Sequence, residues 1–244
     1  MTDRGREALR QSQDVFEVGP SSMRWDGDRL VIEVNEISSP PLISRVRGTV
    51  TLHPDALFGQ VHDLTPDGAH HWQPFAPIAR IEVDLSPGHK WQGHGYFDAN
   101  FGTAALEDDF NYWTWGRFPR SHGATCFYDA VLRDGSEQAT ALHFHPDGRM
   151  EHIAPPPRAR FKRSLWAVRR ETRADAGVVP RQVLPMLDAP FYARSAVQTT
   201  IDGEQSVGVH EALDLRRYAQ PLLKPMLAVR VPRRAGWRFE DAAG

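Results

Sequence analysis

Hydrophobic and polar residues alternate in many short segments of the chain. The segment 80–85, Arg-Ile-Glu-Val-Asp-Leu, has strict period two, which places Ile81, Val83 and Leu85 on one face. Because successive side chains of a β-strand point to opposite faces, this pattern predicts a strand with one buried face. Similar patterns predict further strands over 30–37, 46–52, 125–132, 139–144, 165–168, 196–201 and 206–210.

Turn signals separate these segments at regular intervals. Asp-Gly is favoured in tight hairpin turns, since glycine readily adopts positive φ. The dipeptide occurs five times, beginning at Asp26, Asp67, Asp134, Asp147 and Asp202. The last of these lies between 196–201 and 206–210 and predicts a β-hairpin there.

Helical periodicity is scarce by comparison. Only 7–13 and 213–226 show it, and Pro221 and Pro225 interrupt the second segment. Many short strands with frequent turns predict an all-β protein, an antiparallel barrel or sandwich with few short helices. The proline run at 154–158 and a tryptophan-rich stretch that ends near Arg120 are two candidate domain boundaries.

Charge and cysteine content exclude several classes of protein. The chain has 29 basic and 31 acidic residues, a net charge of −2 that does not indicate a nucleic-acid partner. The single cysteine, Cys126, excludes an intramolecular disulfide and a cysteine-rich zinc site, and it indicates a reducing compartment. No run approaches the roughly 18 apolar residues that span a bilayer, so we expect a soluble or peripheral protein.

Sequence motifs for phosphate, dinucleotide or serine-hydrolase chemistry are missing from the chain. The strongest metal-like pattern is His143-x-His145 followed by Glu151, which could form a cupin-like site. However, residues 145–149 read as a turn, which would separate Glu151 from the two histidines. We therefore favour a solvated hairpin end and predict no metal site.

The stretch 93–117 contains the most informative pattern. As a strand, it places Tyr96, Asp98 and Asn100 on one polar face, and the alternate positions between them are apolar. Trp113 and Trp115 also share a face with each other. The residues alone leave two interpretations open: a pocket lined by indole rings around a carboxyl group, or a packed aromatic core.

Several segments resemble the carotenoid 1,2-hydratases, also called hydroxyneurosporene synthases. One is Gly-Tyr-Phe-Asp-Ala-Asn-Phe-Gly at 95–102, followed by Trp-Thr-Trp-Gly-Arg at 113–117. Another is His-His-Trp-Gln-Pro-Phe-Ala-Pro at 70–77. Further matching segments lie at 189–195, 208–213 and 226–233, so the resemblance extends in order over most of the chain.

The resemblance implies two consecutive lipocalin-like (calycin) antiparallel β domains. We place them at 1–120 and 121–244, with 154–158 as the alternative boundary. It also implies that water is added, without a cofactor, to the terminal C1–C2 double bond of an acyclic carotenoid such as neurosporene or lycopene. That reaction needs a carboxylic acid kept protonated in an apolar site, and aromatic faces that stabilise a tertiary carbocation.

The family's functional residues correspond to four positions here. We expect Asp98 to protonate C2, and Trp72 and Tyr96 to shield the cation. His70 would orient Asp98 or accept a proton from the attacking water, and His71 would be its outward-facing neighbour. Three further residues, Trp113, Trp115 and Asn100, are expected to line the substrate pocket.

A carotenoid is dissolved in membrane, so the resemblance also implies contact with lipid. Seven basic residues lie between Arg158 and Arg173, together with Phe161, Leu165 and Trp166, and this segment is the candidate membrane face. The alternative is a solvated pair of strands. We expect a peripheral protein on the cytoplasmic face of a membrane.

Two other functions use the same features. A lipocalin-like carrier of a lipophilic ligand needs the cavity but no acid, and a polyene cyclase uses the same protonation without adding water. Product mass separates hydration from cyclisation.

Overall fold

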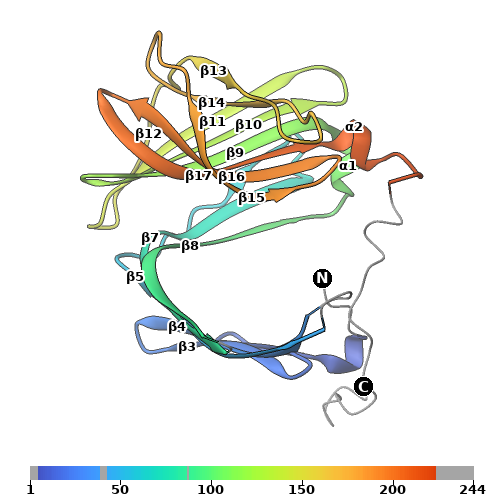
Figure 1. Ribbon diagram of the computed structural model, residues 1–244, viewed down its shortest axis with the longest axis vertical. Helices are drawn as coiled ribbons and strands as arrows, with labels where there is room; N and C mark the ends of the chain where they lie inside the picture. The colour runs from blue at the N-terminus through green and yellow to red at the C-terminus, as the bar shows by residue number, and fades with distance from the viewer. Residues whose placement is uncertain (1–4, 39–42, 87, 224–244) are drawn as a thin grey trace. The chain divides into compact units, whose positions relative to one another are not determined.

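The computed structural model describes residues 5–38, 43–86 and 88–223, whose regular secondary structure is almost entirely β-strand (Figure 1). The strands of the first half are β1 (Leu9–Gln11), β2 (Val15–Val18), β3 (Ser21–Asp26), β4 (Arg29–Ile37), β5 (Arg45–Pro54), β6 (His62–Asp63), β7 (His70–Ser86) and β8 (His89–Gly102). Those of the second half are β9 (Phe110–Arg120), β10 (Gly123–Leu132), β11 (Glu137–Phe144), β12 (Met150–His152), β13 (Arg158–Phe161), β14 (Arg170–Arg173), β15 (Arg181–Asp188), β16 (Tyr192–Ile201) and β17 (Glu204–Asp214). Three short helices complete the described residues: the 3₁₀ turn η1 (Arg6–Ala8), α1 (Leu106–Asp109) and α2 (Leu215–Tyr218).

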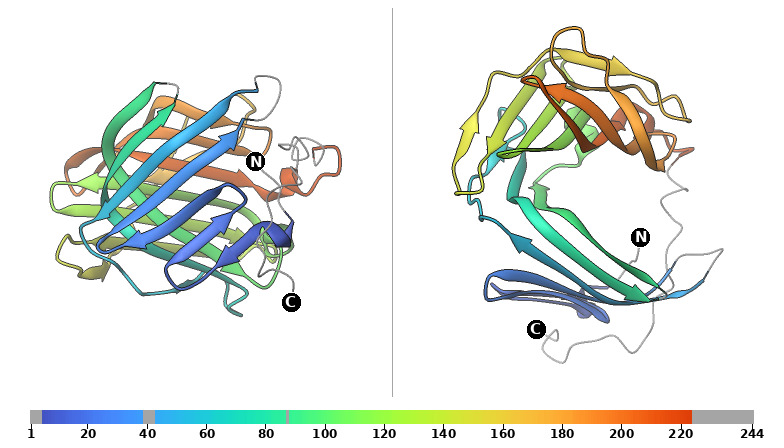
Figure 2. Two further views of the ribbon diagram at one scale, coloured as in Figure 1. Left: turned by 90° about the horizontal axis from the view of Figure 1, so that it is seen from below. Right: turned by 60° about the vertical axis from the view of Figure 1, so that its left-hand side comes forward.

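The first sheet is antiparallel and runs in the order β1-β2-β3-β4-β5-β7-β6, with β8 paired to β7. The blue strands β2 to β5 lie side by side in Figure 2. Val83 is 5% exposed, whereas its neighbours Glu82 and Asp84 are exposed, so the alternation predicted for 80–85 is confirmed. The long strands β7 and β8 carry five of the candidate site residues: His70, Trp72, Tyr96, Asp98 and Asn100.

The second sheet has the order β12-β11-β10-β9-β17-β16-β15, and β13 and β14 form a separate pair. Apolar side chains from adjacent strands make its core, including Phe118, Phe127 and Ile201, each at most 2% exposed. The strand β14 is tied to this sheet by an ion pair, because Arg173 Nε donates to Asp129 Oδ2 over 3.0 Å. Both of these side chains are buried.

Two compact units divide the described chain. Unit 1 consists of the residues up to Pro54 together with Ala79–Tyr96, and unit 2 of Asp55–Ile78 and the residues from Phe97 onward. The boundary predicted at residue 120 does not coincide with this division. Residues on either side of it, in β9 and β10, pair as one hairpin within unit 2.

All five Asp-Gly dipeptides lie in turns, as predicted. Their glycines have φ between 69° and 89°, a region open to glycine because it has no Cβ. In the β16–β17 hairpin Asp202 also has positive φ, 47°, so both central residues adopt the left-handed conformation of a type I′ turn.

Three local predictions were wrong or only partly right. The helix predicted at 7–13 is the short η1 followed by β1, which pairs with β2. The strand predicted at 165–168 is a turn, closed by a 2.9 Å hydrogen bond from Ala167 N to Ser164 O. The helix predicted at 213–226 is limited to α2, and residues 224–226 lie outside the described residues.

The all-β fold class is confirmed, with antiparallel sheets rather than a closed barrel in the described residues. No helix in this part of the chain is long and apolar enough to cross a membrane.

Candidate active site

A hydrogen bond joins two of the predicted catalytic residues. Trp72 on β7 donates its indole Nε1–H to Asp98 Oδ2 on β8 over 2.9 Å. The Trp72 side chain is fully buried, because alternation along β7 turns it and His70 inward while His71 is only partly covered. The N–H of a rigid and otherwise apolar indole ring thereby fixes one carboxylate oxygen of Asp98.

An aromatic cluster surrounds this contact. The ring of Tyr128, on β10, lies 5.7 Å from that of Trp72 and 5.6 Å from that of Trp113. The Nε1 atom of Trp113 is buried and has no hydrogen-bond partner among the described residues. The cluster therefore offers three π-faces and one indole donor beside a carboxyl group.

The charge of Asp98 raises the pKa of several neighbouring groups. Burial raises the pKa of the Tyr128 hydroxyl far above its usual value, and Asp98 and Glu211 raise it further. Burial also raises the pKa of the Cys126 thiol to about 12, with Asp98 adding to this effect and Arg117 opposing it. The Tyr128 hydroxyl and the Cys126 thiol therefore stay protonated and uncharged at physiological pH. Neither of them places a negative charge beside Asp98.

Glu211, on β17, is a second carboxyl group of this site that the sequence did not single out. Pairing of β9 with β17 places it opposite Trp115. Burial raises the pKa of Glu211. Arg194, whose Nε lies 3.3 Å from Glu211 Oε1, lowers this pKa, whereas the charge of Asp98 raises it further. A carboxyl group whose pKa is raised by burial and by a nearby carboxylate is a common feature of acid–base sites.

His70 is held by a carboxylate other than the one we expected. Its Nε2 lies 2.7 Å from Asp109 Oδ2, at the end of α1, and the imidazole is 3% exposed. Asp109 was missed because the acidic run 107–109 reads as an exposed helix start. A contact between residues 39 positions apart depends on the tertiary fold.

A cavity of about 210 Å³ lies beside His70. Asn100 and Gly102 line it together with His70, so the structure brings Asn100 close to the imidazole. A Cβ built on Gly102 would lie 3.2 Å from His70 Nδ1, which places that nitrogen on the Gly102 side of the ring.

The other predicted residues occupy the expected strands. Tyr96 is half-buried on β8 and shares the strand face of Asp98. Trp115 is 7% exposed on β9 and pairs with Tyr128 across to β10.

The turn at 145–149 does not separate Glu151 from the two histidines as expected, because β11 and β12 pair across it and set His143 opposite Glu151. His145 Nε2 lies 3.1 Å from Glu151 Oε1, whereas His143 Nδ1 lies 3.0 Å from Thr125 Oγ1. Among the described residues, no group of three or more histidine, cysteine or acidic side chains is arranged to hold a metal ion.

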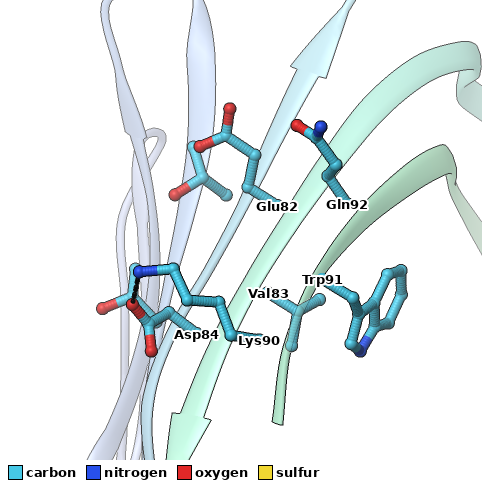
Figure 3. A pocket seen from close by; sticks show the side chains of 8 residues that line it. Glu82, Val83, Asp84, Lys90, Trp91 and Gln92 are labelled. Carbon is cyan, nitrogen blue, oxygen red and sulfur yellow. Dashed lines mark hydrogen bonds and ion pairs between the residues drawn. The ribbon is translucent and has the colours of Figure 1, made fainter.

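A larger cavity of about 410 Å³ lies in unit 1 (Figure 3). Polar side chains line it on one side, and Lys90 Nζ reaches Asp84 Oδ2 over 3.0 Å. None of the predicted site residues is among those that line it.

Known proteins resemble this chain over nearly its whole length. The chain is 64% identical over 239 residues to the acyclic carotenoid 1,2-hydratase of Cereibacter sphaeroides, covering 98% of this chain and 86% of that relative. It is 59% identical to the protein of the same name from Rhodobacter capsulatus, with 99% and 86% coverage. The same-named protein of Thiocapsa roseopersicina is 44% identical and is covered over 58% of its length.

Solved structures show likeness in the fold alone. A Nitrosomonas europaea protein described as an AttH protein aligns with a TM-score of 0.62 at 15% identity, over 85% of this chain and 72% of that one. The structure of CghA with Sch210972 aligns with a TM-score of 0.50 at 11% identity, over 84% and 68% of the two chains. The first of these supports the predicted lipocalin-like fold class.

The family model for carotenoid hydratase CrtC matches residues 1–240. This match and the identity to the named relatives agree with the resemblance found in the sequence. The chain therefore belongs to the carotenoid hydratase CrtC family and is a hydro-lyase.

Proposed function

We propose that this protein adds water to the terminal C1–C2 double bond of an acyclic carotenoid, with Asp98 as the proton donor. The observation that carries the proposal is the 2.9 Å hydrogen bond from Trp72 Nε1 to Asp98 Oδ2. Because Oδ2 accepts this bond, a proton on the carboxyl group resides on Oδ1. The bond therefore orients the acid as well as holding it.

Proton transfer from Asp98 Oδ1 to C2 breaks the C1–C2 π-bond and leaves a tertiary cation at C1. The resulting carboxylate keeps its indole donor, and a hydrogen bond to an ionised group is stronger than one to a neutral group. The rings of Trp72, Tyr128 and Trp113 can each stabilise a desolvated cation by about 0.5–2 kcal/mol. Tyr96, on the same strand face as Asp98, would add a further ring.

Water then attacks C1, and the protonated product loses a proton. His70 can accept it: with Nε2–H donating to Asp109, a neutral imidazole carries its lone pair on Nδ1, the nitrogen on the Gly102 side. Transfer of the proton back to Asp98 completes the cycle with no net change in the protein.

The size of the cavity beside His70 fits this chemistry. Pockets that enclose an entire small-molecule ligand have volumes of about 300–1,000 Å³. A cavity of about 210 Å³ is large enough for one end of a long hydrocarbon beside His70 and Asn100, whereas Asp98 and Trp72 are not among the residues that line it.

The test is incubation of the purified protein with neurosporene or lycopene in detergent, followed by chromatography and mass measurement. The expected product is heavier than the substrate by one water. Asp98→Asn keeps an acceptor for the Trp72 indole and should lower the rate by about 10²–10⁴-fold. Exposed Asp28→Asn is the matched control and should leave the rate unchanged.

Three outcomes would contradict the proposal. Full activity in a folded Asp98→Asn protein would remove this residue as the acid. A product with the same mass as the substrate would indicate cyclisation, and bound but unconverted carotenoid would indicate a carrier.

A further inference from the structure

The last strand of the second sheet, β15, carries an unusual number of exposed apolar side chains. Strand β15 is at the end of the sheet order, and only β16 pairs with it among the described residues. Four of its apolar side chains are at least half exposed: Val183, Leu184, Met186 and Leu187. A contiguous apolar strand of this kind indicates an interaction surface.

The turn at 165–166 lies beside the end of this strand. Leu165 N donates to Asp188 Oδ2 over 2.5 Å, which connects the turn to the last residue of β15. Arg217 holds the other side of the turn, since its Nη1 donates to Trp166 O over 2.8 Å. Both side chains of the turn point outward: Leu165 is 90% exposed and Trp166 is 52% exposed.

Basic residues border these apolar side chains. Lys162 and Arg163 precede the turn and are exposed, and Arg181 is exposed at the start of β15. The acidic groups nearby are engaged: Asp188 accepts the Leu165 N–H, and Glu171 is buried and paired with Arg169. The three cations outnumber the carboxylate of Asp188, so the face combines apolar side chains with a net positive charge.

The broader candidate membrane face, 158–173, is only partly accessible. Phe161, Arg170 and Arg173 are all buried within unit 2, so they are not available to a partner. The exposed residues of that segment are Arg160 on β13 and those around the 165–166 turn.

We propose that the β15 surface, defined as Leu165, Trp166, Val183, Leu184, Met186 and Leu187, docks on an anionic lipid bilayer. Tryptophan favours the interface between headgroups and hydrocarbon, and leucine and methionine favour its apolar side. Lysine and arginine beside them attract anionic headgroups. The proposal rests on the proposed function in one respect, because a hydrocarbon substrate explains why the enzyme would need a bilayer.

A second copy of the chain fits this surface less well. Symmetric pairing of two β15 edges would bring the same basic residues close together from both copies. Pro185 and two register irregularities along the β15–β16 pairing also disfavour the addition of another strand.

The test is co-sedimentation with vesicles of phosphatidylcholine, alone or with added phosphatidylglycerol, at low and high salt and without carotenoid. The wild-type protein should bind the anionic vesicles and bind more weakly at high salt. Trp166→Ser and the double variant Leu184→Ser/Met186→Ser should each weaken binding by about tenfold or more. The charge reversal Lys162→Glu/Arg163→Glu should remove the preference for anionic lipid.

Trp91→Ser is the matched control, because Trp91 is 54% exposed but belongs to unit 1, whereas the β15 surface belongs to unit 2. Its binding should equal that of the wild type. Binding that is absent in the wild type, or unchanged in Trp166→Ser, would overturn the proposal. A dimer that Leu184→Ser disrupts, without vesicle binding, would assign the surface to a second copy instead. In each of these cases hydration in detergent would still test the proposed function separately.

Discussion

The imidazole of His70 is engaged at Nε2 by Asp109, and its Nδ1 lies on the side of Gly102. In histidine–carboxylate pairs of this type the carboxylate selects the tautomer and orients the ring. Asp109 is thus a positioning residue, which acts on the reaction through His70.

Asp109→Asn should lower kcat by about 10–100-fold, because the amide can still contact the ring but no longer selects the tautomer. The KM for the carotenoid should change little, since Asp109 does not line the cavity. Steady-state kinetics in detergent would measure both parameters. Asp108→Asn, an exposed neighbour on the same helix, is the control, and an equal loss in both variants would contradict the role of Asp109.

At the residue scale the sequence identified the residues on single strands and missed those that pairing brings in. His70 with Trp72, and Tyr96 with Asp98, are each two positions apart, so strand alternation alone places them on one face. Tyr128 and Glu211 reach the site because β9 pairs with both β10 and β17. A single sequence does not contain that register.

The strand β14 is fastened to its neighbours by polar contacts as well as by packing. Arg173 makes two hydrogen bonds to the carboxylate of Asp129 on β10. His210 Nε2, on β17, donates to the Glu171 carbonyl over 2.8 Å. These contacts are buried, so we expect each of them to contribute to the stability of the protein.

Arg173→Met should lower the free energy of unfolding by about 3–5 kcal/mol, because it leaves the Asp129 carboxylate buried without its main partner. Urea unfolding followed by circular dichroism would measure the change. Arg160→Met removes a 74% exposed guanidinium from the adjacent strand and should cost less than about 1 kcal/mol. Equal effects of the two substitutions would show that the buried pair is not important for stability.

The stability of the protein should fall as the pH is lowered from about 6.5 to about 4, in part because of His210. Burial lowers the pKa of His210 from 6.5 to about 4, so the unfolded chain binds a proton in this range and the native protein does not. Its contribution is fully present above pH 6.5 and is lost over this window, to a total of about 3 kcal/mol.

The comparison of wild type with His210→Gln isolates this contribution. The variant lacks the titrating group, so the difference in stability between the two proteins should shrink as the pH falls across the window. A difference that does not depend on pH would contradict the assignment.

At the element scale the turns were easier to predict than the helices. Each Asp-Gly carries its own conformational preference, so all five turns followed from sequence. The turn at 165–168 has no such signal, since it requires Ala167 at φ 59° and is held by contacts to Asp188 and Arg217. The apolar residues of this turn therefore resembled a strand in the sequence.

At the scale of the whole molecule, the compact units do not follow the order of the chain. Unit 2 includes Asp55–Ile78 as well as the residues from Phe97 onward, so residues 79–96 interrupt it. The resemblance and the tryptophan-rich stretch ending near Arg120 suggested consecutive domains, because neither carries information about strand pairing.

A fragment of residues 1–120 should consequently fail to fold on its own. It ends after β9, a strand that pairs with β10 and β17 in the intact protein and would lose both partners. Broad amide signals in NMR spectra and the absence of a cooperative urea transition are the expected observations. A cooperative transition in this fragment would support consecutive domains instead.

The buried position of Cys126 has a practical consequence for labelling. This thiol is 0% exposed and its pKa is raised to about 12, so the folded protein should not react with maleimides. A cysteine introduced at position 184 would then be the single reactive site, without any need to remove the native one. A polarity-sensitive fluorophore attached there would shift its emission to the blue on contact with lipid, and would report how deeply β15 enters a bilayer.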